Sequence, residues 1–238
     1  MLCFSAVGIL SEAGISDHFK DYRFGNSTVI YERWNLAGFV VIVGCILMGY
    51  SLSWLAVRGK TPEAVREALG FFPTGEREDI PEADLSAVEM PNGWYVIVAN
   101  HVSQVAPDEA LAQLATEGAE LVTCFVEEHV MESRATGWAE GERKWSASHD
   151  AQRARDHLEA EGHVPDAYGT IMAGAKMKQA LADEKKQRVD HLFDVPVELA
   201  WSVTEFCHDE EVPGLEGLVY EVLSTGKKPS FLGRIFGR

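Results

Sequence analysis

Cysteine is scarce in this sequence, and its four cysteines lie far apart, at Cys3, Cys45, Cys124 and Cys207. No CxxC pair is present, so the spacing signals neither a zinc ribbon nor a disulfide-dense secreted scaffold. Reduced, mostly buried thiols in a cytoplasmic protein are the simplest interpretation. We therefore expect a cytoplasmic location and no metal site.

The sequence also lacks the motifs that mark common catalytic and cofactor sites. It has no GxxxxGK[ST] loop, no GxGxxG after a predicted strand, no GxSxG and no HExxH. These motifs place the groups that bind a nucleotide, activate a serine or hold zinc, so none of those functions is indicated. We expect no cofactor and favour a function that is not enzymatic.

Basic side chains are few, with 21 Lys and Arg against 37 Asp and Glu and a net charge of −16. Residues 48–226 hold most of the acidic excess, with 14 basic and 33 acidic side chains. The electric field of this negative excess repels phosphate backbones, so we expect no nucleic-acid partner. A basic protein is the partner that this charge favours.

Residues 36–57 form an uncharged, mostly apolar run that permits two interpretations. As one helix, the run is long enough to span a membrane and would anchor the protein there. Alternatively, the run divides at Met48, because Tyr50, Leu52 and Trp54 recur at every second position, as on one face of a β-strand. We favour the strand.

This choice sets the expected domain organisation. Residues 1–47 are then a poorly ordered leader or a mis-assigned start, with a possible apolar helix over 36–47. One domain follows over 48–226, a length that suits a single core. Residues 227–238 form a tail with four basic side chains, which could contact an anionic membrane weakly or fold back on the acidic domain.

Local signals divide residues 48–226 into strands and helices. Thr61-Pro62-Glu63 is an N-cap followed by proline at the first helical position, and Asn92-Gly93 between apolar runs indicates a hairpin turn. We expect strands over 50–57, 85–90, 94–100, 121–126, 143–149 and 218–223, with a further alternating, polar strand between Glu127 and Glu140-Gly141. We expect helices over 61–69, 107–116, 165–186 and 196–207, and a loop over 72–84. Adjacent strands with short turns indicate the α+β class, with a mostly antiparallel or mixed sheet covered by about four helices.

The candidate catalytic residues are histidines and carboxylates near one predicted hairpin: His129, Glu132, His149 and Asp150. If Glu140-Gly141 is the turn, the register places Glu132 opposite His149, within one or two residues. A glutamate beside a histidine raises the pKa of that histidine and can form an acid–base pair or supply metal ligands. Cross-strand pairs of opposite charge are also ordinary sheet contacts, worth about 0.2–1 kcal/mol.

Two tryptophans near the same hairpin, Trp138 and Trp145, are candidate partner-binding residues together with Glu128. Exposed tryptophan is common at interaction hot spots because it buries a large area at little entropic cost. Half-buried packing across the sheet is the alternative for both tryptophans.

Four segments carry a family resemblance. They are MGYSLSWLAVRG from Met48, NGWY from Asn92, CFVEEHVM from Cys124 and FDVPVEL from Phe193. Over roughly residues 48–211, the chain resembles a family of uncharacterised bacterial proteins with a domain of unknown function. Such proteins begin near the equivalent of Met48, which agrees with the division of the apolar run. The resemblance implies no activity, so it transfers no catalytic residue.

Three functions follow as hypotheses. The favoured one is a non-enzymatic, immunity-like interaction module that docks a basic protein through charge. The second is a small hydrolase or metal-dependent enzyme that uses His149 and Glu132 with His129 or Asp150. The third is a domain anchored in a membrane through residues 36–57.

Overall fold

The computed structural model describes residues 19–24, 27–36, 39–47, 49–209 and 218–226, and for the first three ranges it describes the backbone alone. The chain divides into two compact units, residues 1–50 and residues 51–238. The expectation of a leader over 1–47 falls partly outside the described residues. The whole tail 227–238 lies outside them.

The first unit contains a three-stranded antiparallel sheet in the order β1-β2-β3. Its strands are β1 (Phe19–Phe24), β2 (Ser27–Leu36) and β3 (Phe39–Leu47). The expected apolar helix over 36–47 is therefore wrong, because β3 pairs along its whole length with β2. Periodicity alone does not separate a short apolar strand from a short apolar helix.

The apolar run does not form one continuous helix. After β3 ends at Leu47, the next strand, β4 (Ser51–Arg58), begins within four residues and belongs to the second unit. Within the described ranges, no helix is both long and apolar enough to cross a membrane. The strand expected over 50–57 is confirmed, and the membrane-spanning helix over 36–57 is wrong.

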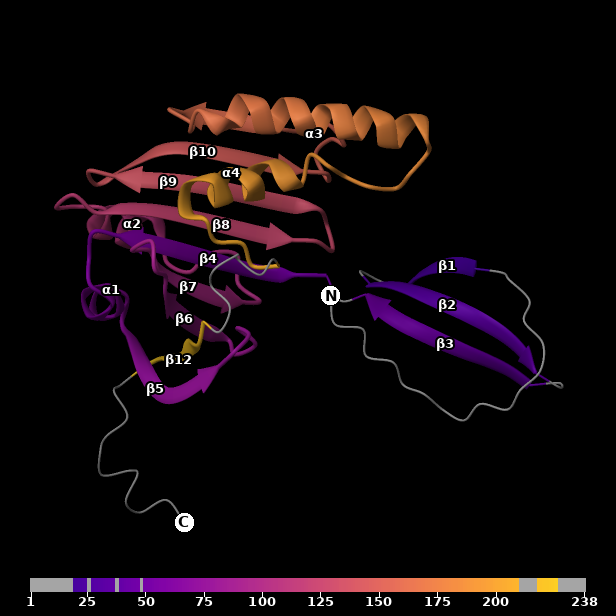
Figure 1. Ribbon diagram of the computed structural model, residues 1–238, viewed down its shortest axis with the longest axis horizontal. Coiled ribbons are helices and arrows are strands. Elements are labelled where there is room, and N and C mark those ends of the chain that lie inside the picture. Colours follow the sequence, from indigo (N-terminus) through magenta and orange to yellow (C-terminus); the bar gives the residue numbers. More distant parts are fainter. Residues whose placement is uncertain (1–18, 25–26, 37–38, 48, 210–217, 227–238) are drawn as a thin grey trace, which may run out of the picture. The chain divides into compact units, whose positions relative to one another are not determined.

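The second unit contains a nine-stranded antiparallel sheet and, in its described part, four helices, which confirms the α+β class (Figure 1). The strand order is β11-β10-β9-β8-β4-β7-β6-β12-β5. Beyond β4, the strands are β5 (Phe71–Glu78), β6 (Leu85–Glu89), β7 (Tyr95–Asn100), β8 (Glu120–Glu127), β9 (Glu132–Ala139), β10 (Glu142–Asp150), β11 (Glu159–Gly162) and β12 (Tyr220–Thr225). The helices are α1 (Pro62–Leu69), α2 (Asp108–Leu114), α3 (Ala167–Glu184) and α4 (Asp194–Thr204).

The central strand β4 lies between β7 and β8 and separates two hydrophobic clusters. Leu52, Trp54 and Ala56 enter the cluster that contains α4, and Leu55 and Val57 enter the cluster that contains α1 and α2. Burial on both faces is typical of a central strand. Figure 1 shows α4 in front of β8 and β9, with α2 behind the sheet. We refer to the two sides as the α4 face and the α2 face.

Local sequence signals account for the helix and the hairpin that they predicted. The Thr61 side chain accepts a hydrogen bond from the Ala64 backbone N–H at 3.3 Å and caps α1. Gly70 ends that helix at a φ of 69°, in the left-handed region that favours glycine. Gly93 has a φ of 87° in the turn between β6 and β7, as the hairpin signal requires.

Three elements differ from the expectations. Part of the expected loop over 72–84 is β5, because it pairs with β12 and buries Phe71, so a distant strand overrides the local Pro and Gly signals. The short strand β11 has no counterpart among the expected strands, since its four residues are all exposed and lack an apolar pattern. Finally, α4 begins at Asp194, two residues before Pro196.

Candidate functional site

The register between β9 and β10 separates the two residues that the sequence placed together. It pairs Glu132 with Asp150, whereas the sequence predicted Glu132 opposite His149. A bulge between Arg143 and Trp145 shifts the pairing by one residue, and a one-residue shift moves a side chain to the other face of a sheet. The predicted register holds within its margin of one or two residues, but the Glu132–His149 pair itself does not form.

His149 is a buried link between segments, with its side chain 0% exposed. Its Nδ1 lies 2.6 Å from the His157 carbonyl oxygen, and its Nε2 lies 3.0 Å from Asp190 Oδ2. Asp190 Oδ1 also accepts the backbone N–H groups of Leu192 and Phe193. Burial favours the neutral ring, but the hydrogen bond and charge of Asp190 outweigh it and raise the pKa of His149. Both ring nitrogens are thus occupied, which leaves neither for a substrate or a metal.

His129 and Asp150, the other candidates of this group, are held by their neighbours. His129 Nδ1 lies 2.7 Å from Glu127 Oε1 in the connection between β8 and β9. Asp150 accepts a hydrogen bond from the Gln152 backbone N–H at 2.9 Å. Within the described ranges, no hydrogen bond joins either residue to His149. The group therefore does not converge into one acid–base site.

The two candidate partner-binding tryptophans are packed inside the domain. Trp138 is 7% exposed and donates its Nε1–H to Thr136 Oγ1 at 2.7 Å. Trp145 is 8% exposed and lies so close to Gly137 that a Cβ there would be 2.0 Å from its ring nitrogen. This burial corrects the expectation that they contact a partner, while Glu128 is half-buried in the β8–β9 connection.

A further group of possible metal ligands follows α4. Cys207, His208 and Asp209 each place one ligand atom within 4.8 Å of the others. Cys207 donates its thiol proton to Asp209 Oδ1 at 2.9 Å. Burial, together with this contact, raises the pKa of Cys207 to about 12. The thiol is therefore protonated at neutral pH, and a metal would have to displace that proton.

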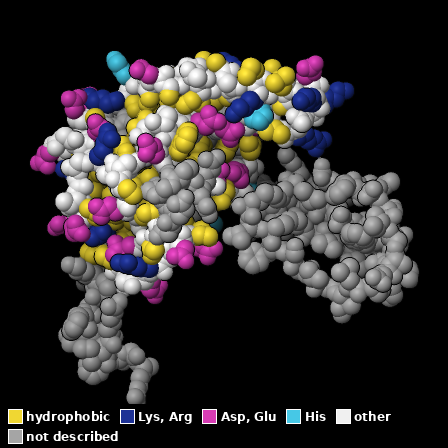
Figure 2. Space-filling model, in the orientation of Figure 1, with side chains coloured by type: hydrophobic (Ala, Val, Ile, Leu, Met, Phe, Trp, Pro, Cys, Tyr) yellow, Lys and Arg dark blue, Asp and Glu magenta, His cyan; other side chains and the backbone are white. Residues whose placement is uncertain are grey.

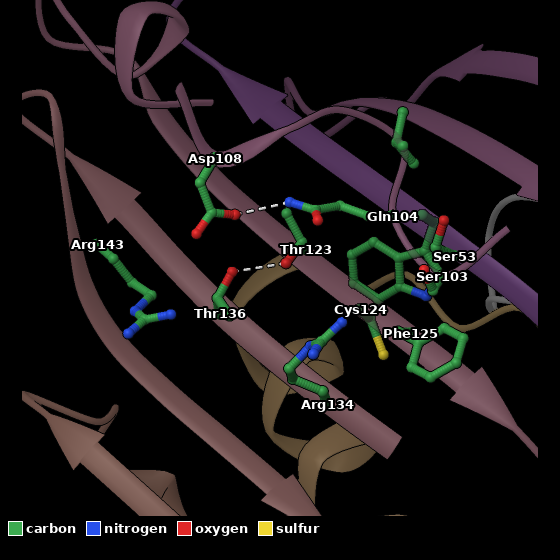
Figure 3. Close-up of a pocket in the computed structure, with 12 residues that line it drawn as sticks. Ser53, Ser103, Gln104, Asp108, Thr123, Cys124, Phe125, Arg134, Thr136 and Arg143 are labelled. Carbon is green, nitrogen blue, oxygen red and sulfur yellow. Dashed lines mark hydrogen bonds between the residues drawn. The ribbon is translucent and has the colours of Figure 1, made fainter. Parts of the chain in front are cut away.

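A cavity of about 170 Å³ lies on the α2 face of the sheet, and none of these candidates lines it (Figure 3). It is bounded by β4, β8, β9, the start of β10 and the segment that leads into α2. Alternation along the strands turns polar residues toward it while their neighbours enter the core on the α4 face. The polar residues of its wall are Ser53, Ser103, Gln104, Asp108, Thr123, Arg134, Thr136 and Arg143.

Two arginines bring positive charge to the cavity, from neighbouring strands (Figure 3). The guanidinium carbon of Arg134, on β9, lies 5.6 Å from the centre of the Phe125 ring. In the described part of the chain Arg134 forms no ion pair, whereas Arg143 lies 3.7 Å from a carboxylate oxygen of Glu161. An unpaired guanidinium that rests on an aromatic ring is well suited to bind an anion.

Hydroxyl groups add unused hydrogen-bond donors to the same wall. Ser53 is 2% exposed, and its Oγ has no hydrogen-bond partner among the described residues. Thr123 and Thr136 share one hydrogen bond of 2.6 Å (Figure 3), and Thr136 Oγ1 also accepts from Trp138. Because the two threonines carry two hydroxyl protons and their mutual bond uses one, the other proton is available. An unsatisfied buried hydroxyl costs about 1–3 kcal/mol, so these groups favour a bound acceptor.

A carboxylate faces the arginines across the cavity. Asp108 is the first residue of α2, and Figure 3 shows it on the other side of the threonine pair from Arg134. Its Oδ1 accepts a hydrogen bond from Gln104 Nε2 at 2.7 Å. The structure shows no ion pair between Asp108 and either arginine of the cavity. Opposite charges therefore line the same cavity without pairing with each other.

The sequence alone does not reveal this cavity, because its wall is assembled from four strands and a loop. One signal was present: Ser53 and Thr123 are polar residues within the largely apolar strands β4 and β8, and Arg134 places a charge within β9. Such interruptions are unusual in central strands, where both faces are apolar. Which of them meet depends on strand order and register, and both are set by long-range pairing.

Comparisons with known proteins give no information about function, so the function is inferred from the geometry of the cavity. No protein-family model, curated protein or solved structure matches the chain. The resemblance to an uncharacterised bacterial family therefore stays an expectation.

Proposed function

We propose that the second unit is a non-enzymatic binding domain whose cavity holds a small anionic ligand. The observation that carries this proposal is the guanidinium of Arg134, which lacks a carboxylate partner among the described residues and shares a cavity with the enclosed, unsatisfied hydroxyl of Ser53. Carboxylate and phosphate oxygens accept hydrogen bonds from both kinds of donor.

The size of the cavity sets the size of the ligand. Its volume is about 170 Å³, and an apolar cavity of roughly 150 Å³ is known to bind benzene. A ligand with about six to eight non-hydrogen atoms therefore fits. This excludes a nucleotide or a peptide as an enclosed ligand, although either could present one small anionic group.

The chemistry of the wall favours binding over turnover. His149, the most promising base from the sequence, projects from β10 on the α4 face with Trp145 and Ala147, so it does not reach the cavity. Cys124 borders the cavity, but burial raises the pKa of its thiol far above the ordinary value. A protonated thiol is a poor nucleophile. What the wall supplies is mainly donors, which hold an acceptor in place.

Titration of the full chain with inorganic phosphate, sulfate and acetate tests this proposal, with amide chemical shifts and calorimetry as readouts. We expect shifts at the cavity and a loss of affinity of about tenfold or more in R134Q, because a hydrogen bond to a charged group is worth about 1.5–3 kcal/mol. R77Q is the matched control, since the exposed Arg77 lies on β5 with five strands between it and β9. Equal affinities in wild type and R134Q, or the failure of every anionic probe to bind, would contradict the proposal.

A second proposal keeps the basic protein partner that the charge favours. Ile80 is 55% exposed in the connection between β5 and β6. The acidic side chains exposed near it in the sequence are Glu76, Asp79, Glu82, Asp84 and Glu89. Acidic groups are also spread over the face shown in Figure 2. An apolar side chain within an acidic surface could dock a basic protein as an immunity-like module would, with affinity that falls as salt rises.

A charge-matched pair of variants tests the second proposal. D79N/E82Q/D84N removes three charges beside Ile80, and E67Q/E109Q/E142Q removes three exposed charges elsewhere. We expect a basic protein recovered at low salt by the wild type to be lost only with the first variant. Equal loss with both variants would show that net charge, and not this surface, drives the contact.

A further inference from the structure

We infer that the ligand of this cavity is a small zwitterion, with a carboxylate at one end and an ammonium group at the other. The inference rests on the proposed anion-binding function and adds a second pole to the site. Its starting point is the separation of Arg134 from Asp108, two opposite charges that share a cavity without forming an ion pair with each other.

Asp108 has capacity left for a cationic group. Its Oδ1 holds Gln104 Nε2 at 2.7 Å, and its Oδ2 accepts no hydrogen bond from the described residues. Asp108 is exposed, and the contact with Gln104 already restricts its carboxylate in part, which reduces the side-chain entropy lost when a ligand binds. An ammonium group carries three donors and a full charge, and it matches a free carboxylate oxygen better than any neutral group.

The other end of the cavity accepts the carboxylate of the same ligand. Arg134 supplies guanidinium donors, and the enclosed Ser53 hydroxyl supplies a proton with no partner among the described residues. Between the two poles, the Thr123–Thr136 pair offers its one remaining hydroxyl proton. A carboxylate has about four acceptor positions, which is enough acceptors to match these donors in number.

The charge of the whole domain favours a ligand with no net charge. Residues 48–226 carry 33 acidic and 14 basic side chains, so their field opposes the approach of a simple anion. A zwitterion experiences almost no long-range repulsion, because its two charges cancel at distances beyond its own length. It still delivers a full negative charge to Arg134 at close range. The field therefore selects for a bipolar ligand and against a simple carboxylate.

The test compares 4-aminobutyrate with butyrate, which differ by the ammonium group, in calorimetric titrations of the full chain. We expect the wild type to bind 4-aminobutyrate about tenfold more tightly, the effect of one hydrogen bond between charged groups. In D108N this preference should disappear, because the amide retains the Oδ1 that binds Gln104 but loses the charge. E109Q is the matched control: Glu109 is the next residue of α2, exposed and outside the cavity wall, and its variant should keep the wild-type preference.

The outcomes separate this inference from the proposed function. A preference that falls to about equal affinity in D108N alone supports the zwitterion. Equal affinities for both probes in the wild type, or a preference that survives in D108N, overturn the zwitterion and leave anion binding intact. If neither these probes nor phosphate, sulfate or acetate binds, the proposed function fails as well. Thermal unfolding of D108N beside the wild type shows whether the variant has kept its fold.

Discussion

Removal of the Asp190 carboxylate tests whether His149 is a structural link. Asp190 receives the backbone N–H groups of Leu192 and Phe193 at 3.1 and 3.3 Å and lies 3.0 Å from His149 Nε2. In D190A these donors lose their acceptor, and removal of one partner of a buried ion pair costs about 3–5 kcal/mol. Because the Asp190 side chain is 15% exposed, water can replace part of the contact, so we expect a loss of about 3 kcal/mol, at the lower end of that range.

The pH dependence of this loss has a defined sign. The raised pKa of His149 means that its charged form contributes stability in full below its ordinary value of 6.5, and that this stability is lost as the pH rises through the raised value. For Asp190, burial acts to raise the pKa, but the hydrogen bond and charge of His149 lower it below 3.8. Its contribution is present above that ordinary value and is lost as the pH falls through the lowered one. The pair therefore stabilises the fold most between pH 3.8 and 6.5.

Urea unfolding followed by circular dichroism measures this contribution at about pH 5.5 and at about pH 9. The difference between wild type and D190A should be largest at the lower pH and should shrink in the basic buffer. D183N is the control, because Asp183 pairs with Arg155 on the exposed surface, where such a pair is worth about 0–1 kcal/mol. If D190A and D183N lose the same stability, or if the loss in D190A is independent of pH, the ion-pair argument is refuted.

Two further perturbations follow from the packing. In G137A the new Cβ would lie 2.0 Å from the Trp145 ring nitrogen, so we expect the free energy of unfolding to fall by about 1–3 kcal/mol. The control is G174A, which lies in open space on α3 and should raise helix stability by about 0.5–1 kcal/mol. A G137A variant as stable as the wild type would contradict the packing. A chain that begins at Met48 should unfold cooperatively in urea. One that begins at Lys60 lacks β4, which lies between β7 and β8, and should aggregate. If the Lys60 chain is soluble and unfolds cooperatively, β4 is dispensable.

Elements that carry their own signals could be predicted from the sequence. The cap at Thr61, the turn at Asn92-Gly93 and the alternation along β4 depend on residues within about one turn or one strand of each other. The structure contains each of them where it was expected. Such signals act before any tertiary contact forms, so they need no knowledge of strand order.

Elements that depend on distant partners could not be predicted. The strand β5 exists because β12, which follows about 150 residues later, pairs with it, as Ser224 does with Phe72, 152 residues away. A register with Glu132 opposite His149 also implies Arg143 opposite Trp138. That pair is present, and the observed register of β10 differs by one residue after the bulge. That single extra residue decides which side chains share a face, and it is what separates Glu132 from His149.

Residue type and residue availability point to different sites in this domain. His149 has the chemistry of a catalyst, but both of its ring nitrogens are hydrogen-bonded and its side chain is enclosed. Ser53 and Arg134 are less conspicuous in the sequence, yet they keep donors that no other described group uses. Because a folded protein satisfies nearly all of its buried polar groups, a buried donor left without a partner is better evidence for a ligand than a reactive side chain that is fully bonded. By this criterion the candidate site moves from the α4 face of the sheet to the α2 face.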